Sequence, residues 1–234
     1  MTEGSPRIAI VGLGRMGREV ADVARERGLA VVARLDQEEI ADRVGALDAL
    51  RAADVAIEFT TPEAAVANID LCLEASCPVV VGTTGWYDEL DAVRARVLDQ
   101  GGALLHAPNF SVGVALVKAL CERAGELLAG LEGFDVHLTE THHAEKKDAP
   151  SGTAFLLKAA LDRAGHDVPI TSIRIGFVPG RHEVCIDGSY EQVIVSHDAR
   201  SRRVFADGAL RAALWLRGRS GVFTMDDVLN LERA

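Results

Sequence analysis

The sequence predicts an α/β protein with a parallel sheet in its N-terminal half and an α+β region with an antiparallel or mixed sheet after it. Two observations lead to this fold class. Short apolar segments alternate with helix-like segments in the first half, and segments of alternating polarity follow one another in the second half. The first pattern is typical of right-handed βαβ units, which build parallel sheets. The second pattern is typical of strands joined by short turns.

The first half is predicted to contain five short strands. They are expected at Arg7–Val11, Ala30–Leu35, Val55–Phe59, Val79–Val81 and Ala103–His106. A first helix should run from a glycine-rich turn to about Arg27, and another should cover residues 88–99. Thr61 and Pro62 suit the start of a further helix, because they offer a capping hydroxyl and a proline at the first helical position.

The second half is predicted to open with a long helix over Val112–Leu128. Strands are expected at Phe134–Thr141, Ser172–Phe177, Glu183–Asp187 and Tyr190–His197. Helices are expected at Thr153–Ala164, Asp207–Leu216 and Thr224–Leu231. Pro-Gly and Asp-Gly pairs between the later strands are typical of turns.

The composition is that of a globular protein with an acidic surface. Of 234 residues, 48% are hydrophobic, and 25 basic against 35 acidic residues give a formal net charge of −10. This balance disfavours nucleic-acid partners and anionic membranes. No apolar run approaches the roughly 20 residues that span a bilayer, and no export signal is visible, so a cytoplasmic protein is expected. The cysteines show no metal or redox spacing and should be reduced thiols.

A glycine-rich turn after the first strand predicts a dinucleotide-binding site. It reads Gly12-Leu13-Gly14-Arg15-Met16-Gly17 and joins the strand to the first helix. The first glycine permits the tight turn, the second lets the backbone approach a pyrophosphate, and the third lets helix and strand pack closely. Free amides at the helix start favour phosphates. The context predicts a Rossmann-type domain, and the alternative is a glycine turn without a ligand in another α/β protein.

Asp36 is the candidate ribose ligand. It ends the second strand, about 20 residues beyond the glycine turn, where a carboxylate holds the hydroxyls of the adenosine ribose. A carboxylate there repels a 2′-phosphate, so NADH is favoured and NADPH remains possible. Arg34, two residues earlier, would soften that repulsion only if it shared a face with Asp36.

Two further loops follow strands of the predicted parallel sheet. Gly82-Thr83-Thr84-Gly85 follows the fourth strand, and Ala107-Pro108-Asn109-Phe110 follows the fifth. Doubly wound folds bind ligands at the carboxyl ends of their strands. Both loops are therefore candidates for contacts with the nicotinamide or its ribose, with ordinary turns as the alternative.

The segment ETHHAEKKDAPSGT at residues 140–153 is the second candidate site. It gathers two histidines and two lysines in an acidic chain, immediately before a predicted helix start. Cations and open helix amides suit a small carboxylate, and a neighbouring His and Lys can supply a proton. The alternatives are a solvated loop and an ordinary helix cap. Paired histidines also occur in metal sites, but HxxxH and HExxH spacings are absent, so no metal is expected.

In order and spacing, these motifs resemble the 4-hydroxy-tetrahydrodipicolinate reductase (dihydrodipicolinate reductase) family. The resemblance rests on the three loops above, on Ser111-Val112-Gly113, on HHAEKKDAPSGTA at 142–154, and on Phe205–Ala209 with Ala212–Leu216. It covers nearly the whole chain, and the element at 142–154 is its most specific part.

The resemblance implies an enzyme of lysine and diaminopimelate biosynthesis that reduces a cyclic unsaturated dicarboxylate with NADH or NADPH. His142 and Lys146 match the family's proton donors, and His143, Gly152 and Thr153 match positions that hold the substrate carboxylate. The matching cofactor positions are Gly12–Gly17, Asp36, Gly82–Thr84 and Ala107–Phe110. Gln37 stands where many relatives carry an Arg or Lys for the 2′-phosphate, which favours NADH. Many relatives also have a longer segment than 37–54 between the second and third strands.

The resemblance also implies two domains. Residues 1–110 would bind the dinucleotide, with 205–234 returning to them. Residues 111–204 would form a substrate-binding and oligomerisation domain, whose open mixed sheet commonly builds a homotetramer. Two rival functions remain at this point. One is an NAD(P)-dependent amino-acid or amine dehydrogenase on a similar scaffold, and the other is an NAD(H)-sensing regulator, against which the acidic charge and the absence of a basic helix argue.

Overall fold

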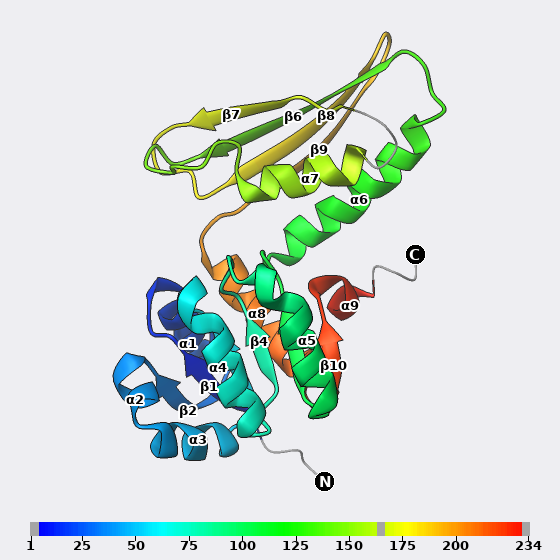
Figure 1. Cartoon of the computed structure of the whole chain (residues 1–234). Helices are drawn as coiled ribbons and strands as arrows, with labels where there is room; N and C mark the ends of the chain where they lie inside the picture. The colour runs from blue at the N-terminus through cyan, green and yellow to red at the C-terminus, as the bar shows by residue number, and fades with distance from the viewer. Residues whose placement is uncertain (1–4, 163–166, 231–234) are drawn as a thin grey trace. The chain divides into compact units, whose positions relative to one another are not determined.

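The chain folds into two structural units. In the described residues of the first unit, six strands form one parallel sheet (Figure 1). The strands are β1 (Arg7–Val11), β2 (Ala30–Leu35), β3 (Val55–Glu58), β4 (Val79–Val81), β5 (Ala103–His106) and β10 (Gly221–Phe223). They lie in the order β10-β5-β4-β3-β1-β2. The computed structural model describes residues 5–162 and 167–230. The first unit comprises Met1–Phe110 with Phe205–Ala234, and the second comprises Ser111–Val204.

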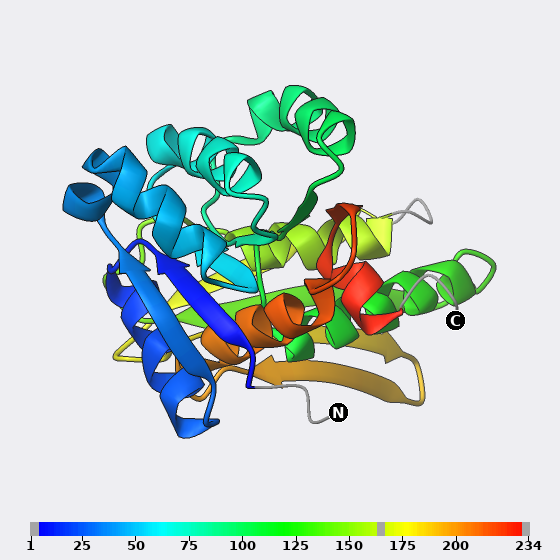
Figure 2. The same cartoon turned by 90° about the horizontal axis from the view of Figure 1, so that it is seen from below.

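Helices cover both faces of this sheet, as an all-parallel sheet requires. They are α1 (Arg15–Glu26), α2 (Gln37–Ala41), α3 (Arg43–Arg51), α4 (Pro62–Glu74), the 3₁₀ turn η1 (Tyr87–Glu89), α5 (Leu90–Asp99), α8 (Arg203–Leu216) and α9 (Met225–Leu229). The helices α3, α4 and α5 share one apolar core with the strands, and α1 and α8 lie across the other face (Figure 2). The central strands are buried on both sides, and all three valines of β4 are buried.

The second unit is built on a mixed sheet. Its strands are β6 (Phe134–His142), β7 (Ile170–Arg174), β8 (Arg181–Gly188) and β9 (Gln192–Asp198), in the order β7-β6-β8-β9. The β6–β7 pair is parallel, and the β6–β8 and β8–β9 pairs are antiparallel. Two helices, α6 (Val112–Leu128) and α7 (Gly152–Asp162), pack against one face of this sheet through Leu138, Leu157 and Val184 (Figure 1).

The predicted fold class is confirmed, with corrections at several elements. Residues 37–54, for which no element was predicted, form α2 and α3, and the three-residue strand β10 was also missed. The strand predicted at Ser172–Phe177 lies earlier, at Ile170–Arg174, because pairing with β6 ends at His142↔Arg174. Thr61 occupies the N-cap of α4, but its side chain makes no capping hydrogen bond.

The ends of other predicted elements differ by a few residues. The third strand ends at Glu58, and the two later strands of the second unit run over Arg181–Gly188 and Gln192–Asp198, so Gly188 belongs to a strand and the turn follows it. The last two helices begin at Arg203 and Met225. The predicted helix ends at Ala164 and Leu231 lie outside the described residues.

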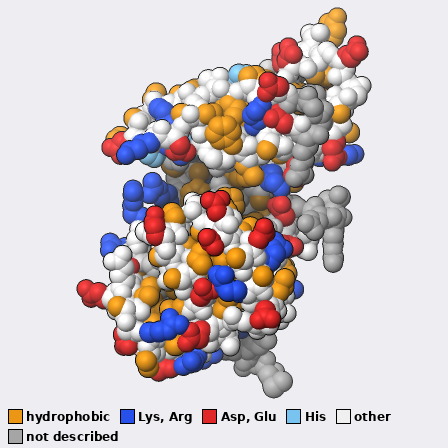
Figure 3. Space-filling view, viewed as in Figure 1, with side chains coloured by type: hydrophobic (Ala, Val, Ile, Leu, Met, Phe, Trp, Pro, Cys, Tyr) orange, Lys and Arg blue, Asp and Glu red, His pale blue; other side chains and the backbone are white. Residues whose placement is uncertain are grey.

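Charges of both signs are interspersed over the face of the molecule drawn in Figure 3. None of the helices within the described residues is long and apolar enough to cross a membrane.

Candidate functional site

The glycine-rich turn after β1 has the close backbone approaches that its sequence predicts. Gly12 has φ +90°, and its amide donates to the Leu35 carbonyl at 2.7 Å. A β-carbon at Gly12 would overlap the Phe59 carbonyl, and one at Gly17 would overlap the Gly12 carbonyl. Gly14 caps the start of α1, and a β-carbon there would meet only open space. The turn is therefore closed on its protein side and open at the start of α1, as an anion site at a helix N-terminus requires.

The remaining predicted cofactor residues lie at the carboxyl ends of neighbouring strands. Arg15 is exposed and Leu13 and Met16 are half-buried, and the Leu13 carbonyl accepts from Nε of Arg18 at 2.9 Å. Asp36 follows β2, is exposed, and occupies the N-cap of α2, where its amide donates to Glu39 at 2.9 Å. The structure thus brings the turn after β1 and the residue after β2 to the same edge of the sheet.

The loops after β4 and β5 are anchored through two phenylalanines. A β-carbon at Gly82 would overlap the Phe59 ring, and Phe59 packs edge-on against Phe110 at 6.0 Å between ring centroids. Thr83 is buried and Thr84 is exposed. Ala107 is buried, Pro108 is exposed and Asn109 is half-buried. Phe59 was assigned no role from the sequence, although Phe59 lies against both predicted loops, at Gly82 and at Phe110.

A buried carboxyl group lies beneath these loops. Glu58 at the end of β3 is fully buried, and one of its oxygens accepts from the Thr60 amide at 3.1 Å. The Thr60 amide also donates to the Thr83 hydroxyl at 2.7 Å. Burial raises the pKa of Glu58, although hydrogen bonds from Thr60, Thr83 and Asn68 act in the opposite direction. Glu58 thereby ties the loop after β3 to the loop after β4.

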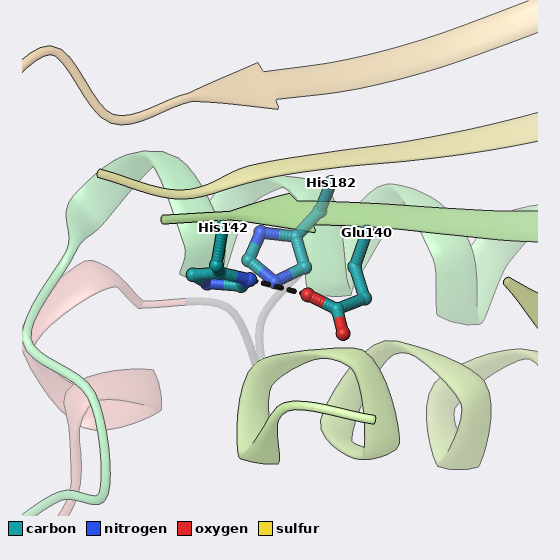
Figure 4. Close-up of side chains that lie close together, drawn as sticks. All are labelled: Glu140, His142 and His182. Atoms are coloured by element: carbon teal, nitrogen blue, oxygen red, sulfur yellow. Dashed lines mark hydrogen bonds and ion pairs between the residues drawn. The ribbon is translucent and has the colours of Figure 1, made fainter. Parts of the chain in front are cut away.

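The second candidate site lies at the end of β6, where three polar side chains share one face of the mixed sheet. Glu140 and His142 are two residues apart on β6 and therefore point to the same side, and His182 of β8 is paired directly with Glu140. All three residues are buried. Nδ1 of His142 forms a hydrogen bond with the Glu140 carboxylate, and the rings of His142 and His182 meet edge-on at 5.2 Å (Figure 4).

Arg174 joins this cluster to the loop that follows it. It stands opposite His142 in the parallel register of β6 and β7. One terminal nitrogen of its guanidinium donates to Glu140 at 2.6 Å and to the Asp148 carbonyl at 2.6 Å. The carboxylate of Glu140 is therefore bound on one oxygen by His142 and on the other by Arg174.

The predicted donor Lys146 lies in this loop and is held by a neighbouring carboxylate. Its Nζ donates to both oxygens of Asp148, at 2.7 and 2.9 Å. The backbone turns tightly here, because the Lys146 amide donates to the His143 carbonyl at 3.1 Å. His143 is half-buried. The structure thus places His142, His143 and Lys146 in one short stretch at the end of β6.

The start of α7 is anchored to the same cluster. The Ser151 hydroxyl accepts from the Ala154 amide at 3.2 Å, which caps the helix, and it lies 3.1 Å from Nε2 of His182 in a second hydrogen bond. Gly152 is exposed and Thr153 is half-buried. The predicted carboxylate-binding positions therefore stand at a helix N-terminus that His182 fixes to the sheet.

The electrostatics of the cluster follow from burial and from Arg174. Burial acts to raise the pKa of Glu140, but hydrogen bonds from Arg174, Ser172 and His142 outweigh it and lower that pKa to about 2. Burial lowers the pKa of His142, and Glu140 only partly opposes this effect. Burial and the neighbouring His142 lower the pKa of His182 to about 4. At neutral pH the cluster thus consists of an ionised carboxylate and two histidines that are mainly neutral.

Donor atoms of Glu140, His142 and His182 lie within 4.8 Å of one another, close enough to share a metal ion. However, both carboxylate oxygens are already engaged, one by a guanidinium at 2.6 Å. The contacts favour a hydrogen-bonded network over a cation site. The predicted absence of a metal stays a prediction.

Two family models match the chain and together cover most of it. "Dihydrodipicolinate reductase, N-terminus" matches residues 6–110, and "Dihydrodipicolinate reductase, C-terminus" matches residues 113–229. The chain belongs to the dihydrodipicolinate reductase family. The match includes both candidate sites and confirms the resemblance seen in the sequence.

Relatives within this family match over nearly their whole length. The chain is 36% identical to the 4-hydroxy-tetrahydrodipicolinate reductase of Christiangramia forsetii, over 95% of this chain and 97% of the relative. It is 37% identical to the enzyme of the same name from Thiobacillus denitrificans, over 97% and 100%. A solved dipicolinate-bound dihydrodipicolinate reductase from a Paenisporosarcina species superposes with a TM-score of 0.78 at 25% identity, covering 94% of this chain and 97% of that one.

A likeness of fold also extends outside the family. An amine dehydrogenase from Mycobacterium smegmatis superposes with a TM-score of 0.62 at 12% identity, over 96% of both chains. At this identity the likeness shows a common fold alone, so it does not favour the dehydrogenase alternative.

From the sequence, no role was assigned to Glu140, the first residue of the segment at 140–153, and Arg174 and His182 were missed. Glu140, Arg174 and His182 come from three strands and meet only through the register of the sheet. Gly180 was interpreted as part of a turn, but a β-carbon there would come within 3.1 Å of Nε2 of His142. One signal was available, because a carboxylate two residues before a histidine on a strand must lie on the same face.

Proposed function

We propose that this chain is a 4-hydroxy-tetrahydrodipicolinate reductase, which reduces (2S,4S)-4-hydroxy-2,3,4,5-tetrahydrodipicolinate to tetrahydrodipicolinate with NAD(P)H in lysine and diaminopimelate biosynthesis. The observation that carries this function is the match to relatives of that name at 36% and 37% identity over at least 95% of the chain. The second unit adds support, since it gathers a histidine, a lysine and the N-terminus of a helix in one place.

The reaction consumes one hydride and one proton for each substrate and releases one water. Bound NAD(P)H supplies the hydride to the ring, and the negative charge that then develops on the ring is stabilised by nearby donors. We assign the proton to His142 or Lys146. Nδ1 of His142 is engaged by Glu140, so Nε2 is the nitrogen that would face the substrate.

The substrate carries two carboxylates, and the segment at 142–153 provides groups of the right charge. We assign one carboxylate to the amides and hydroxyl at Gly152 and Thr153, at the N-terminus of α7, where backbone donors and the helix dipole favour an anion. We assign His143 and Lys146 to contacts with the same doubly negative substrate. Substrate would compete with Asp148 for the ammonium group of Lys146.

The cofactor is proposed to be NADH in preference to NADPH. The first unit belongs to an NAD(P)-binding family, and its glycine turn offers an open helix start for the pyrophosphate. The finer preference rests on Asp36, which is exposed at the end of β2 and would repel a 2′-phosphate. Gln37 supplies no positive charge beside it.

Assembly into a homotetramer and a cytoplasmic location are also proposed. The sheet face of the second unit that is turned away from α6 and α7 carries Ile173 and Ile194, which are 41% and 53% exposed. Ile173 pairs with Thr141 and Ile194 pairs with Cys185. By the alternation along a strand, these two partners point to the opposite side of the sheet from the buried Leu138 and Val184. Apolar surface that forms a contiguous patch marks a protein–protein contact site, and these two isoleucines would form part of such a patch in the proposed assembly. Light scattering of the purified protein would measure the mass of the assembly.

The decisive experiment measures initial rates on freshly generated 4-hydroxy-tetrahydrodipicolinate with NADH and with NADPH. We expect turnover with both, a higher kcat/KM with NADH, and competitive inhibition by pyridine-2,6-dicarboxylate, the ligand of the solved relative. Reductive amination of keto acids with ammonia serves as the comparison. Turnover in that assay, with none on the cyclic dicarboxylate, would overturn the proposal.

A further inference from the structure

Among the described residues of the second unit, Glu140 is the most deeply buried charged group that the function proposed above does not use. Its side chain is fully buried, and it lies on the same face of β6 as His142. The carboxylate points at Nδ1 of His142 (Figure 4). An acceptor at Nδ1 fixes the neutral ring in the tautomer that carries its proton on Nδ1.

Arg174 keeps the charge of Glu140 in place. A buried carboxylate without a partner would take up a proton, but the guanidinium donates to it at 2.6 Å. The same nitrogen donates to the Asp148 carbonyl at 2.6 Å, in the loop that carries Lys146. The ionised carboxylate is thus also connected to the backbone that positions the second candidate proton donor.

The orientation of the His142 ring leaves one nitrogen for chemistry. With Nδ1 turned to Glu140, Nε2 points toward the backbone at Gly180, where a β-carbon would come within 3.1 Å of it. A glycine at this place keeps the approach to Nε2 open. The edge-on contact with His182 restricts rotation of the His142 ring from the side.

We propose that Glu140 is a positioning residue for His142: it holds the Nδ1–H tautomer, presents Nε2 to the substrate, and stabilises the imidazolium that must form before a proton is given to the ring. This inference rests on the proposed function and deepens it. The arrangement has the logic of a carboxylate that orients a catalytic histidine. Glu140 itself touches no substrate and acts only through His142.

The charged groups around His142 determine whether the pKa of His142 rises or falls when Glu140 is replaced. Glu140 on β6 favours the imidazolium, while Arg174 on β7 and Lys146 in the loop disfavour it, and His182 on β8 stays neutral at pH values well above 4. Glu140 is thus the group among these four that holds the proton on His142. Its removal should lower the pKa of His142 and move the alkaline limb of the activity profile to lower pH.

The test compares Glu140→Gln with a matched control on the neighbouring strand, Glu183→Gln. Glu183 lies next to His182 but faces the other side of the sheet, where it pairs with Arg181 at 2.6 Å. In Glu140→Gln we expect kcat on 4-hydroxy-tetrahydrodipicolinate to fall about 10- to 100-fold, with KM changed less than about threefold. The alkaline limb should move down by about 1 to 3 pH units. Glu183→Gln should keep the wild-type rate and profile.

A wild-type pH profile and rate in folded Glu140→Gln would overturn the proposal. If that variant fails to fold because Arg174 is left as a half-buried cation without its carboxylate partner, the double variant E140Q/R174M restores the charge balance. The double variant should show the same loss of kcat and the same shift of the alkaline limb as Glu140→Gln. Wild-type kinetics in the double variant would equally contradict the positioning role of Glu140.

A second measurement needs no activity and separates this inference from the proposed function. Nitrogen NMR of the histidine-labelled wild-type protein, assigned by comparison with His142→Gln, reports which ring nitrogen carries the proton. A proton on Nδ1, in protein treated with EDTA, supports the inference, and a proton on Nε2 alone refutes it. An Nδ1–H tautomer in a protein without reductase activity would refute the function while the Glu140–His142 pair stands.

Discussion

Gly180 lies against the imidazole of His142, so that a β-carbon at position 180 would come within 3.1 Å of Nε2. The contact joins the backbone between β7 and β8 to the end of β6. Because Gly180 has no side chain, space remains beside Nε2 of His142, the nitrogen that we assign to proton transfer. A methyl group there would occupy part of that space.

The first prediction concerns this space. Gly180→Ala should lower kcat about 10- to 100-fold, because a small displacement at a reacting nitrogen costs this much, and it should also lower the melting temperature, because Gly180 has φ +158°. Gly133→Ala is the matched control, since Gly133 also has a positive φ, of +86°, and a β-carbon there would meet nothing within 4 Å. Steady-state kinetics of both variants provide the measurement. A wild-type kcat in the Gly180→Ala variant would show that Nε2 is approached from another side.

The second prediction concerns His142. Its pKa lies below the ordinary 6.5 because of burial, so the free enzyme carries mainly neutral imidazole at pH 7. If the protonated form is the active one, kcat/KM should rise as pH falls from 8 toward 6, since kcat/KM reports the groups of the free enzyme. His142→Gln should lower kcat about 100-fold or more and abolish this limb. Retention of the limb in the variant would assign it to another group.

The third prediction concerns Lys146. Its ammonium group is held by Asp148 at 2.7 Å, near the start of α7. Lys146→Ala should lower kcat/KM for the dicarboxylate by at least about tenfold, because it removes a charge-assisted contact and a candidate proton donor. The neighbouring Lys147 is exposed, and Lys147→Ala should behave as wild type. Equal losses in the two variants would mean that net positive charge, rather than the position of Lys146, is what matters.

Four of the strands and the long helix follow closely from local sequence. β1, β2, β4, β5 and α6 begin and end where they were predicted, because each is an apolar run or period bounded by turn residues. The helices α2 and α3 were missed because they are short and polar, and α2 buries no residue. β10 has three residues, too few for a periodic signal, and depends on pairing with β5.

In the second candidate site, too, the residues that are close in the sequence were predicted, and those brought together by strand pairing were not. His142, His143 and Lys146 were visible as an unusual run of cations in an acidic chain. Glu140 lies in the same segment but its role was not visible, and Arg174 was not found at all, because single charged residues on strands are normally solvated. Only the β6–β7 register brings these two residues into contact. His182 is likewise 40 residues beyond His142 in the sequence and reaches it through the β6–β8 pairing.

The fourth prediction concerns the cofactor. Asp36 is exposed at the carboxyl end of β2, where it can hold the ribose hydroxyls of NADH and repel the 2′-phosphate of NADPH. Asp36→Ala should weaken NADH binding about tenfold and leave NADPH binding unchanged or tighter. Fluorescence titration with each nucleotide measures this ratio. An equal loss for both nucleotides would contradict the ribose role.

The last prediction concerns stability and follows from Glu58. Its pKa is raised above 4.5 by burial, so folding favours the protonated carboxyl. The stability that this group contributes is therefore fully present below about pH 4.5 and is lost as pH rises through the higher pKa of the folded state, at about 1.4 kcal/mol for each unit of difference. Glu58→Gln stays neutral and should remove this part of the decline. Urea unfolding at pH 5 and pH 8, with the exposed Glu89→Gln as control, measures the difference. A wild-type protein and an E58Q variant with the same pH dependence would mean that Glu58 ionises as easily in the fold as in the unfolded chain.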